Sequence, residues 1–298
     1  MTTDISNHGD KSPPQSGDES PHSIISAVRE IGPSAIAFSG GIDSVLVAAA
    51  FLRANVPVLA IHVALPLQPR AESSRVPDIA RQLNLPFKQI KLPFTKLPFL
   101  KNNPPDRCYR CKKTLLAAIQ TLAHKHGFTT LCDGTHAADL LDDRPGLKAV
   151  AEFQVRSPLL DARLTKPEIL RLAKRWKLPF AGRVGSACLA TRIPTHARVT
   201  PQKLATIEAA EVALLNLGFQ TLRVRHHDAI ARVELPPADL PRALKLRAAL
   251  LDALRPLGFR HITLDLAGYK TGNMNGNSEH RARNSEVRKK VAASPPHN

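Results

Sequence analysis

A glycine-rich turn near the start of the chain has the residue types that hold phosphate groups. The turn reads Ser39-Gly40-Gly41-Ile42-Asp43-Ser44. Residues 35–38 before it predict a buried strand, and residues 45–52 after it predict an apolar helix. Glycines let backbone N–H groups approach a ligand, and a helix start adds unpaired donors and a positive dipole end. The serines add hydroxyl donors, and the aspartate can cap the helix or hold Mg²⁺ on the phosphates.

The turn is not the mononucleotide loop GxxxxGK(S/T), because no lysine follows the second glycine, and it does not match GxGxxG. It resembles the SGGxDS loop of the ATP pyrophosphatases, which split ATP between its α and β phosphates and adenylate an oxygen of the substrate. That resemblance implies a Rossmann-like parallel sheet of the PP-loop type with ATP and Mg²⁺ at the turn. The alternative is a glycine turn in another α/β domain.

Three of the four cysteines form a second candidate group. Cys108 and Cys111 have C-x2-C spacing just before a predicted helix, and Cys188 follows far along the chain. The helix dipole and four cationic neighbours predict lowered thiol pKa values. These neighbours are Arg107, Arg110, Lys112 and Lys113. Cys132 falls in an apolar run and is expected in the core.

The cysteines leave three interpretations open. A zinc site needs a fourth ligand, which would be Cys132 or a histidine. A redox pair needs Cys108 and Cys111 alone and leaves Cys188 unused. A 4Fe-4S cluster on three cysteines leaves one iron open to bind sulfide or substrate. The adenylating turn favours the cluster, because activating an oxygen with ATP and replacing it with sulfur is one coherent reaction.

The elements that must position these residues alternate between strands and helices in the first two thirds of the chain. Strands are expected at 35–38, 58–63, 87–91 and 129–132, and helices at 23–31, 45–54, 71–83, 112–125 and 167–176. This alternation predicts an α/β fold with a parallel sheet. From residue 201 the order changes to helix (201–217), strands (221–226 and 230–235), helix (240–254) and strand (261–266), which predicts a smaller α+β domain. We therefore expect domains at 23–195 and 196–275, with disordered tails at 1–22 and 276–298.

The chain of 298 residues has a formal net charge of +17. The charges of the two tails are −3 and +3 and cancel, so the central part is basic. A basic surface attracts polyanions, and RNA, ATP and phosphorylated metabolites all qualify, as does a general arginine bias on solvated faces. No apolar run is long enough to span a membrane and no secretory signal opens the chain, so we expect a cytoplasmic protein without membrane contact.

Six stretches, in order over about residues 23–275, resemble the LarE family of ATP-dependent sulfur transferases, which help to make the nickel-pincer nucleotide cofactor of lactate racemase. They are FSGGIDS (38–44), KNNPPDRCYRCKK (101–113), DRPGLKA (143–149), ACLATRIP (187–194), LRVRHHDAIARVELP (222–236) and ITLDLAGYKTGNMN (262–275). The resemblance implies that the carboxylates of pyridinium-3,5-biscarboxylic acid mononucleotide are adenylated and converted to thiocarboxylates. In one branch a single cysteine gives up its sulfur, and in the other three cysteines hold a 4Fe-4S cluster. Cys108 and Cys111 beside Cys188 resemble the second branch.

The resemblance also assigns roles by position. It implies catalytic roles for Cys188, Lys112 and Arg192. It implies nucleotide contacts for Asp133, Gly134, Asp139 and Arg144, besides the turn. It implies contacts to the substrate phosphate or a cation for Arg223, Arg225, Glu211 and Glu234. Independently of the resemblance, the side chains of two arginines that stand two positions apart on a strand point to the same face and can form a fork for a phosphate. The alternative for the arginines is an exposed basic strand. The alternative for Glu211 is a solvated helix face.

The expected partners are the pyridinium mononucleotide, sulfide or a sulfur donor, and further copies of the chain as a homo-oligomer. Three rival functions remain open. A tRNA thiolase with the same turn and a three-cysteine cluster would suit the basic charge, although we do not expect a nucleic acid partner because Ile42 stands where many such enzymes have lysine. A zinc-stabilised nucleotide-binding module would not be an enzyme. An amide-forming synthetase would leave three cysteines unexplained.

Overall fold

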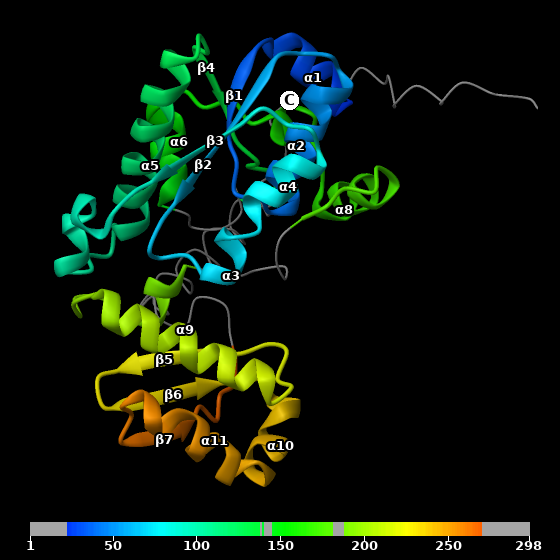
Figure 1. Cartoon of the computed structure of the whole chain (residues 1–298). Helices are drawn as coiled ribbons and strands as arrows, with labels where there is room; N and C mark the ends of the chain where they lie inside the picture. The colour runs from blue at the N-terminus through cyan, green and yellow to red at the C-terminus, as the bar shows by residue number, and fades with distance from the viewer. Residues whose placement is uncertain (1–22, 138, 140–144, 181–187, 270–298) are drawn as a thin grey trace, which may run out of the picture.

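The computed structural model describes residues 23–137, 139, 145–180 and 188–269. A parallel sheet of four strands forms its first half, in the order β3-β2-β1-β4 (Figure 1). The strands are β1 (Ser34–Ala37), β2 (Val58–Ala64), β3 (Phe87–Lys91) and β4 (Thr130–Cys132). The predicted Rossmann-like α/β arrangement and its four strands are confirmed. The predicted tails at 1–22 and 276–298 lie outside the described residues.

Helices cover both faces of this sheet (Figure 1). One face is covered by α1 (Ile24–Ile31), α2 (Ile42–Arg53), α4 (Val76–Gln82), α7 (Pro158–Asp161) and α8 (Lys166–Arg175). The other is covered by α5 (Arg107–Lys125), on which α6 (Gly146–Glu152) packs. Helix α2 is apolar on nearly all sides because it packs against the sheet and against α1, α7 and α8. Among the described residues, no helix combines the length and apolarity needed to cross a membrane.

The loops after β1 and β4 lie next to each other. In the parallel pairing of these strands Ile36 stands opposite Cys132, so both strands end at the same edge of the sheet. The glycine-rich turn follows β1, and Asp133 and Gly134 follow β4. Ligands of open α/β sheets bind at the carboxyl ends of strands, so the edge that carries both predicted nucleotide loops is the expected place for a site.

A second sheet follows in the order β5-β6-β7, with an antiparallel and then a parallel pairing. Its strands are β5 (Arg223–His227), β6 (Ile230–Glu234) and β7 (His261–Leu264), with helices α9 (Pro201–Asn216), α10 (Leu240–Lys245) and α11 (Arg247–Leu254). Helix α9 joins the two halves, because Leu204 and Ile207 pack into the core of the first and Ala210 and Leu214 into that of the second.

Several helix boundaries differ from the predicted ones. Helix α5 begins at Arg107, not at Lys112, so the cysteine pair lies inside its first turns. The helix predicted at 71–83 is two short helices, α3 (Arg70–Ser73) and α4, because Pro77 fits the first turn of a helix but not its interior. Short 3-10 turns complete the described elements: η1 (Phe94–Lys96), η2 (Pro98–Lys101), η4 (Leu189–Arg192), η5 (Pro237–Asp239) and η6 (Arg255–Leu257).

Candidate active site

The glycine-rich turn depends on Gly40 for its shape. Gly40 has φ +75°, which side-chain-bearing residues rarely adopt, and a Cβ there would lie 2.9 Å from Val76 Cγ2. Ser39 Oγ and Ser44 Oγ are 3.1 Å apart, and Ser44 Oγ donates to the carbonyl of Gly41 at 3.0 Å. Both hydroxyls therefore lie inside the turn, at the N-terminus of α2, where the sequence predicts phosphate contacts.

Asp43 does not cap α2, and that part of the prediction is wrong. Gly41 is the N-cap residue, without a side-chain hydrogen bond, and Asp43 lies in the first helical turn. The Asp43 carboxylate instead accepts from Lys166 Nζ at the start of α8, and His136 Nε2 is 4.0 Å from the same oxygen. Asp139 accepts from the backbone N–H of His136 at 3.0 Å. The structure thus brings Asp43 and Asp139 together through His136.

Sequence reasoning missed Lys166 and His136. One signal was available for Lys166: a cation in the first turn of a helix opposes the helix dipole, so its presence there calls for a nearby anion. His136 carried no comparable signal, because one loop histidine between predicted elements is common. Arg144, which the sequence predicts on the nucleotide side, lies outside the described residues.

Asp133 and Gly134 connect the turn to the cysteine helix. A Cβ at Gly134 would lie 2.9 Å from the backbone N of Ser44, so only glycine lets this loop pack against the turn. The buried Asp133 carboxylate accepts from Thr135 Oγ1 and Ser157 Oγ, each at 2.9 Å. Lys112 Nζ, on α5, is 3.3 Å from Asp133 Oδ2. Lys112, on the helix that carries Cys108 and Cys111, therefore contacts the loop that packs against the glycine-rich turn.

We expect Gly134→Ala to weaken the nucleotide binding that the sequence predicts at the turn, because the new methyl group would push the loop away from Ser44. Overpacking of this kind costs about 1–3 kcal/mol. Calorimetric titration with ATP and chemical denaturation of the same samples would separate lost binding from lost stability. Gly146→Ala is the matched control, since its added Cβ would meet Lys112 at an ordinary 3.8 Å. Equal ATP affinity in Gly134→Ala and wild type would contradict this packing role.

The segment that carries Cys188 is held against the start of α5. Asn103 Nδ2 donates to the carbonyl of Pro194 at 2.7 Å, and Arg107 Nη1 donates to that of Ala190 at 3.4 Å. The backbone N of Leu189 donates to the carbonyl of Leu67, in the loop after β2, at 2.8 Å. These bonds fix the segment between the carboxyl edge of the sheet and the cysteine helix.

The three thiols lie near enough to influence one another. Burial, then Cys188, then Cys108 raise the pKa of the Cys111 thiol to about 12. Burial also raises the pKa of Cys188, against the opposing effect of Arg107. The lowering of thiol pKa that was predicted for the C-x2-C pair is therefore wrong for Cys111, because loss of hydration outweighs the cationic neighbours. Cys132 is fully buried in β4, as predicted.

The cysteines do not form a ligand set in the described conformation. Within the described ranges, no group of three or more His, Cys, Asp or Glu side chains is arranged to hold a metal ion. The donor chemistry nevertheless fits an iron-sulfur cluster, since all three thiols are free and interact electrostatically. Because burial favours the protonated thiols of Cys111 and Cys188, a cluster bound by them would have to displace protons.

In metal-free, reduced protein we expect iodoacetamide to modify Cys108 quickly and Cys111 slowly. Cys108 is exposed, whereas burial keeps the proton on Cys111, and the thiolate is the form that reacts. Below its pKa the thiolate fraction rises with pH, so the Cys111 rate should rise about tenfold per pH unit between pH 7 and 9. Peptide mapping by mass spectrometry measures both rates, with urea-unfolded protein as the control. Equal rates at both cysteines in folded protein would refute the burial argument.

Arg192 is buried and fixes the cysteine segment to the C-terminal half. Its side chain is 1% exposed, and it donates to Glu211 Oε1 and Oε2 at 2.8 and 2.9 Å. Its Nη1 donates to the carbonyl of Cys188 at 3.1 Å. Glu211 also accepts from the backbone N of Val224 at 3.1 Å. Glu211 is therefore not a solvated helix residue, and Arg192 orients the Cys188 backbone.

Arg225 and Glu234 form a buried ion pair behind this segment. Arg225 Nη2 donates to Glu234 Oε2 at 2.7 Å, and its Nη1 donates to the carbonyl of Thr191 at 2.9 Å. Arg223 donates to the carbonyl of Leu222 at 2.7 Å and lies 5.2 Å from the ring of Tyr269. Burial and then Arg192 lower the pKa of Arg223. The exposed-strand alternative is wrong for Arg225, which is 4% exposed and bound to Glu234. The phosphate role of the two arginines stays a prediction.

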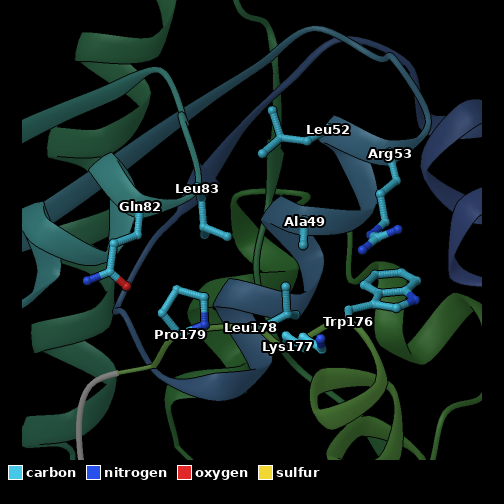
Figure 2. Close-up of a pocket in the computed structure, with 9 residues that line it drawn as sticks. All are labelled: Ala49, Leu52, Arg53, Gln82, Leu83, Trp176, Lys177, Leu178 and Pro179. Atoms are coloured by element: carbon cyan, nitrogen blue, oxygen red, sulfur yellow. The ribbon is translucent and has the colours of Figure 1, made fainter.

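A surface hollow of about 370 Å³ lies away from the glycine-rich turn and the cysteines (Figure 2). Its lining comes from the last turns of α2, the end of α4 and the segment after α8: Ala49, Leu52, Arg53, Gln82, Leu83, Trp176, Lys177, Leu178 and Pro179. The Arg53 guanidinium lies 4.5 Å from the centre of the Trp176 ring. The glycine-rich turn is at the opposite end of α2, so this hollow is separate from the candidate site.

Comparison with known proteins adds three relatives, although no family model matches the chain. It is 34% identical over 256 residues to the pyridinium-3,5-bisthiocarboxylic acid mononucleotide synthase of Lactiplantibacillus plantarum, covering 85% of this chain and 92% of that protein. It is 32% identical over 249 residues to an uncharacterized protein of Synechocystis sp. (83% and 93% covered). It is 30% identical over 236 residues to an uncharacterized protein of Methanocaldococcus jannaschii, covering 79% of this chain and 90% of that protein. Each likeness is long enough to extend across both halves of the chain.

Proposed function

The chain belongs to the LarE family, and from that premise we propose that it is an ATP-dependent sulfur insertase of nickel-pincer cofactor biosynthesis. Its substrate is pyridinium-3,5-biscarboxylic acid mononucleotide, whose carboxylates it adenylates and converts to thiocarboxylates. The printed name of the relative in Lactiplantibacillus plantarum gives the bisthiocarboxylic acid as product. The SGGxDS turn supports ATP as the activating substrate, in a domain of the PP-loop pyrophosphatase type.

The observation that carries this proposal is the ion pair of Lys112 and Asp133. Asp133 precedes Gly134, which packs on Ser44 in the glycine-rich turn. Lys112 directly follows Cys111, whose pKa responds to Cys188 and Cys108. An anion-binding turn and three thiols are thus connected by one pair of side chains. Activation of a carboxylate and delivery of sulfur need this proximity, because an acyl-adenylate in water is otherwise hydrolysed.

In the first step, a substrate carboxylate oxygen attacks the α phosphorus of ATP. The bond between the α phosphorus and the bridging oxygen breaks, and pyrophosphate leaves. Backbone N–H groups of the turn and the hydroxyls of Ser39 and Ser44 stabilise the charge on the leaving pyrophosphate. Lys112 stabilises the charge that develops on the α phosphoryl oxygens, and Asp133 holds its ammonium group in place.

In the second step, a sulfur nucleophile attacks the acyl carbon, and the bond from that carbon to the AMP oxygen breaks. Cys108, Cys111 and Cys188 would hold a 4Fe-4S cluster in the three-cysteine branch of the family. When bound by three cysteines, such a cluster supplies an open iron position and a source of sulfide. Arg192 keeps the Cys188 backbone in position through its hydrogen bond to the carbonyl.

The test is incubation of anaerobically purified protein with ATP, Mg²⁺, a sulfide source and the biscarboxylate nucleotide. We expect AMP, pyrophosphate and a thiocarboxylate product whose mass shows oxygen replaced by sulfur. Bulk tRNA in place of the biscarboxylate nucleotide tests the tRNA thiolase alternative. Ammonia in place of sulfide tests the amide-forming alternative. Thiolated tRNA or an amide product without any thiocarboxylate would overturn the proposal, as would a zinc-containing protein that releases no pyrophosphate.

A further inference from the structure

A buried histidine on β2 lies behind the glycine-rich turn. His62 is 1% exposed, and its Nδ1 is 3.0 Å from the carbonyl oxygen of Phe38. Phe38 stands directly before Ser39, the first residue of the turn. The parallel pairing of β1 with β2 ends one residue earlier, at Ala37. The side chain of His62 therefore adds a hydrogen bond between the two strands at the residue that leads into the turn.

The two ring nitrogens of His62 have different partners, and these partners determine its tautomer. Burial lowers the pKa of His62, against the opposing effect of its bond to Phe38, so the ring is neutral at pH 7. A carbonyl oxygen only accepts, so Nδ1 carries the hydrogen and donates to Phe38. Nε2 is then the acceptor, and Ser73 Oγ, at 3.2 Å, donates to it. Both nitrogens of this buried ring are thus used, and they join Phe38 to Ser73.

Ser73 is the last residue of α3, and the other end of this short helix is held by α9. Glu208, on α9, accepts from the backbone N–H of Arg70, and its second carboxylate oxygen is 3.5 Å from Arg70 Nε. The side chain of Arg70 is 85% exposed and that of Glu208 only 18%, so the backbone bond contributes more than the solvated charge pair. Helix α3 thus links the first sheet to α9 (Figure 1).

The residues on either side of α3 contact the turn and the cysteine segment. Val76, at the start of α4, packs against Gly40, where an added Cβ would lie 2.9 Å from Val76 Cγ2. The carbonyl of Leu67, before α3, accepts at 2.8 Å from the backbone N–H of Leu189, the residue after Cys188. A displacement of α3 would therefore affect both parts of the candidate site.

We propose that His62 is a positioning residue for ATP: it fixes the carbonyl of Phe38, and with it the backbone N–H groups of the glycine-rich turn, in the orientation that receives phosphate. Ser73 orients the ring, and Glu208 keeps α3 in place. Backbone donors stabilise a phosphate best when they already point at it, because reorienting them on binding uses part of the interaction energy. This inference rests on the proposed use of ATP, and it assigns a role to a side chain that acts through the backbone of the turn.

The experiment compares His62→Leu and His62→Asn with wild type by calorimetric titration with ATP in Mg²⁺ buffer. Leucine fills the space and removes both hydrogen bonds, so we expect ATP affinity to fall about tenfold. Asparagine places an N–H near the position of Nδ1 but cannot reach Ser73, so it should recover most of the affinity. His124→Leu, at an exposed histidine on α5, is the matched control and should bind ATP like wild type. Urea denaturation of the same samples measures any loss of stability separately.

Three variants that leave His62 in place keep the test decisive if leucine prevents folding. Ser73→Ala removes the partner of the ring and Glu208→Ala releases α3, and each should lower ATP affinity about threefold. Glu208→Gln keeps an oxygen that accepts from the N–H of Arg70, so it should bind ATP like wild type.

Two results would overturn the inference. One is wild-type ATP affinity in folded His62→Leu, or in both Ser73→Ala and Glu208→Ala, which would leave these contacts with a role in stability alone. The other is an equal loss of affinity in His62→Asn and His62→Leu, because the bond to Phe38 would then not be the one that matters. Wild-type protein that binds no ATP would instead refute the proposed use of ATP itself.

Discussion

Replacing Cys188 by alanine should abolish thiocarboxylate formation while pyrophosphate is still released from ATP in the presence of the biscarboxylate nucleotide. Water would then hydrolyse the acyl-adenylate to AMP and the original carboxylate. In the function proposed above, the Cys188 thiol either gives up its own sulfur or helps to hold the cluster, so we expect the rate to fall at least about a thousandfold. The residues that we propose to bind ATP lie on other segments, at the turn and after β4. Separate assays of pyrophosphate release and of thiocarboxylate mass measure the two half-reactions.

Cys132→Ala is the matched control, because it removes a thiol from the core and not from the candidate site. It should cost about 1 kcal/mol of stability and leave sulfur insertion intact. Cys108→Ala and Cys111→Ala then separate the two chemistries. A cluster on three cysteines predicts that both lose all turnover, whereas a sulfur given up by Cys188 itself predicts one product per chain and a dehydroalanine at 188. Full turnover by Cys188→Ala would remove this residue from the mechanism.

Glu234→Gln should lower the free energy of unfolding by about 3–5 kcal/mol, because it leaves the buried Arg225 guanidinium without its anion. Glu234 is fully buried and accepts from Arg225 and Arg232, at 2.7 and 2.9 Å. Arg225 Nε already has no hydrogen-bond partner among the described residues, so further loss of its carboxylate partner is costly. Urea denaturation followed by circular dichroism measures the change.

The comparison for this prediction is Asp78→Asn, which removes the anion of an exposed pair with Arg81 on α4. Exposed pairs contribute about 1 kcal/mol or less, so this variant should resemble wild type. The same samples test the substrate role of Arg225: if the residue is structural, Glu234→Gln and Arg225→Ala lose stability alike. A stable Glu234→Gln protein with impaired binding of the pyridinium mononucleotide would instead support the predicted substrate role of the pair.

Sequence reasoning located the strands because a short apolar run bounded by turn residues is typical of a strand in a parallel sheet. It placed β3 at the observed residues and the other three sheet strands within one residue at each end. It failed at the start of α5, which begins five residues before the predicted position. The charged and cysteine-containing first turns of α5 lack apolar periodicity, and their helical conformation is fixed by contacts such as that of Arg107 with Asn103.

One error in the candidate site has a clear physical origin. The thiol pKa of Cys111 was predicted from its neighbours in sequence, whereas burial decided it. Cys111 has four cationic neighbours in sequence, yet loss of hydration raises its pKa. The phosphate fork of Arg223 and Arg225 stays a prediction, and the structure adds a partner that spacing did not indicate, Glu234 on the adjacent strand.

The sequence by itself determined the anion-binding turn, the alternation that makes a parallel sheet, and the family, because these depend on local residue types and their order. The tertiary structure alone decided which side chains meet: Lys166 with Asp43, Lys112 with Asp133, and Arg192 with Glu211. Each of these pairs joins segments that are separate in sequence and becomes strong where packing removes water. Charge pairing of this kind depends on distance and burial, which exist only once the chain has folded.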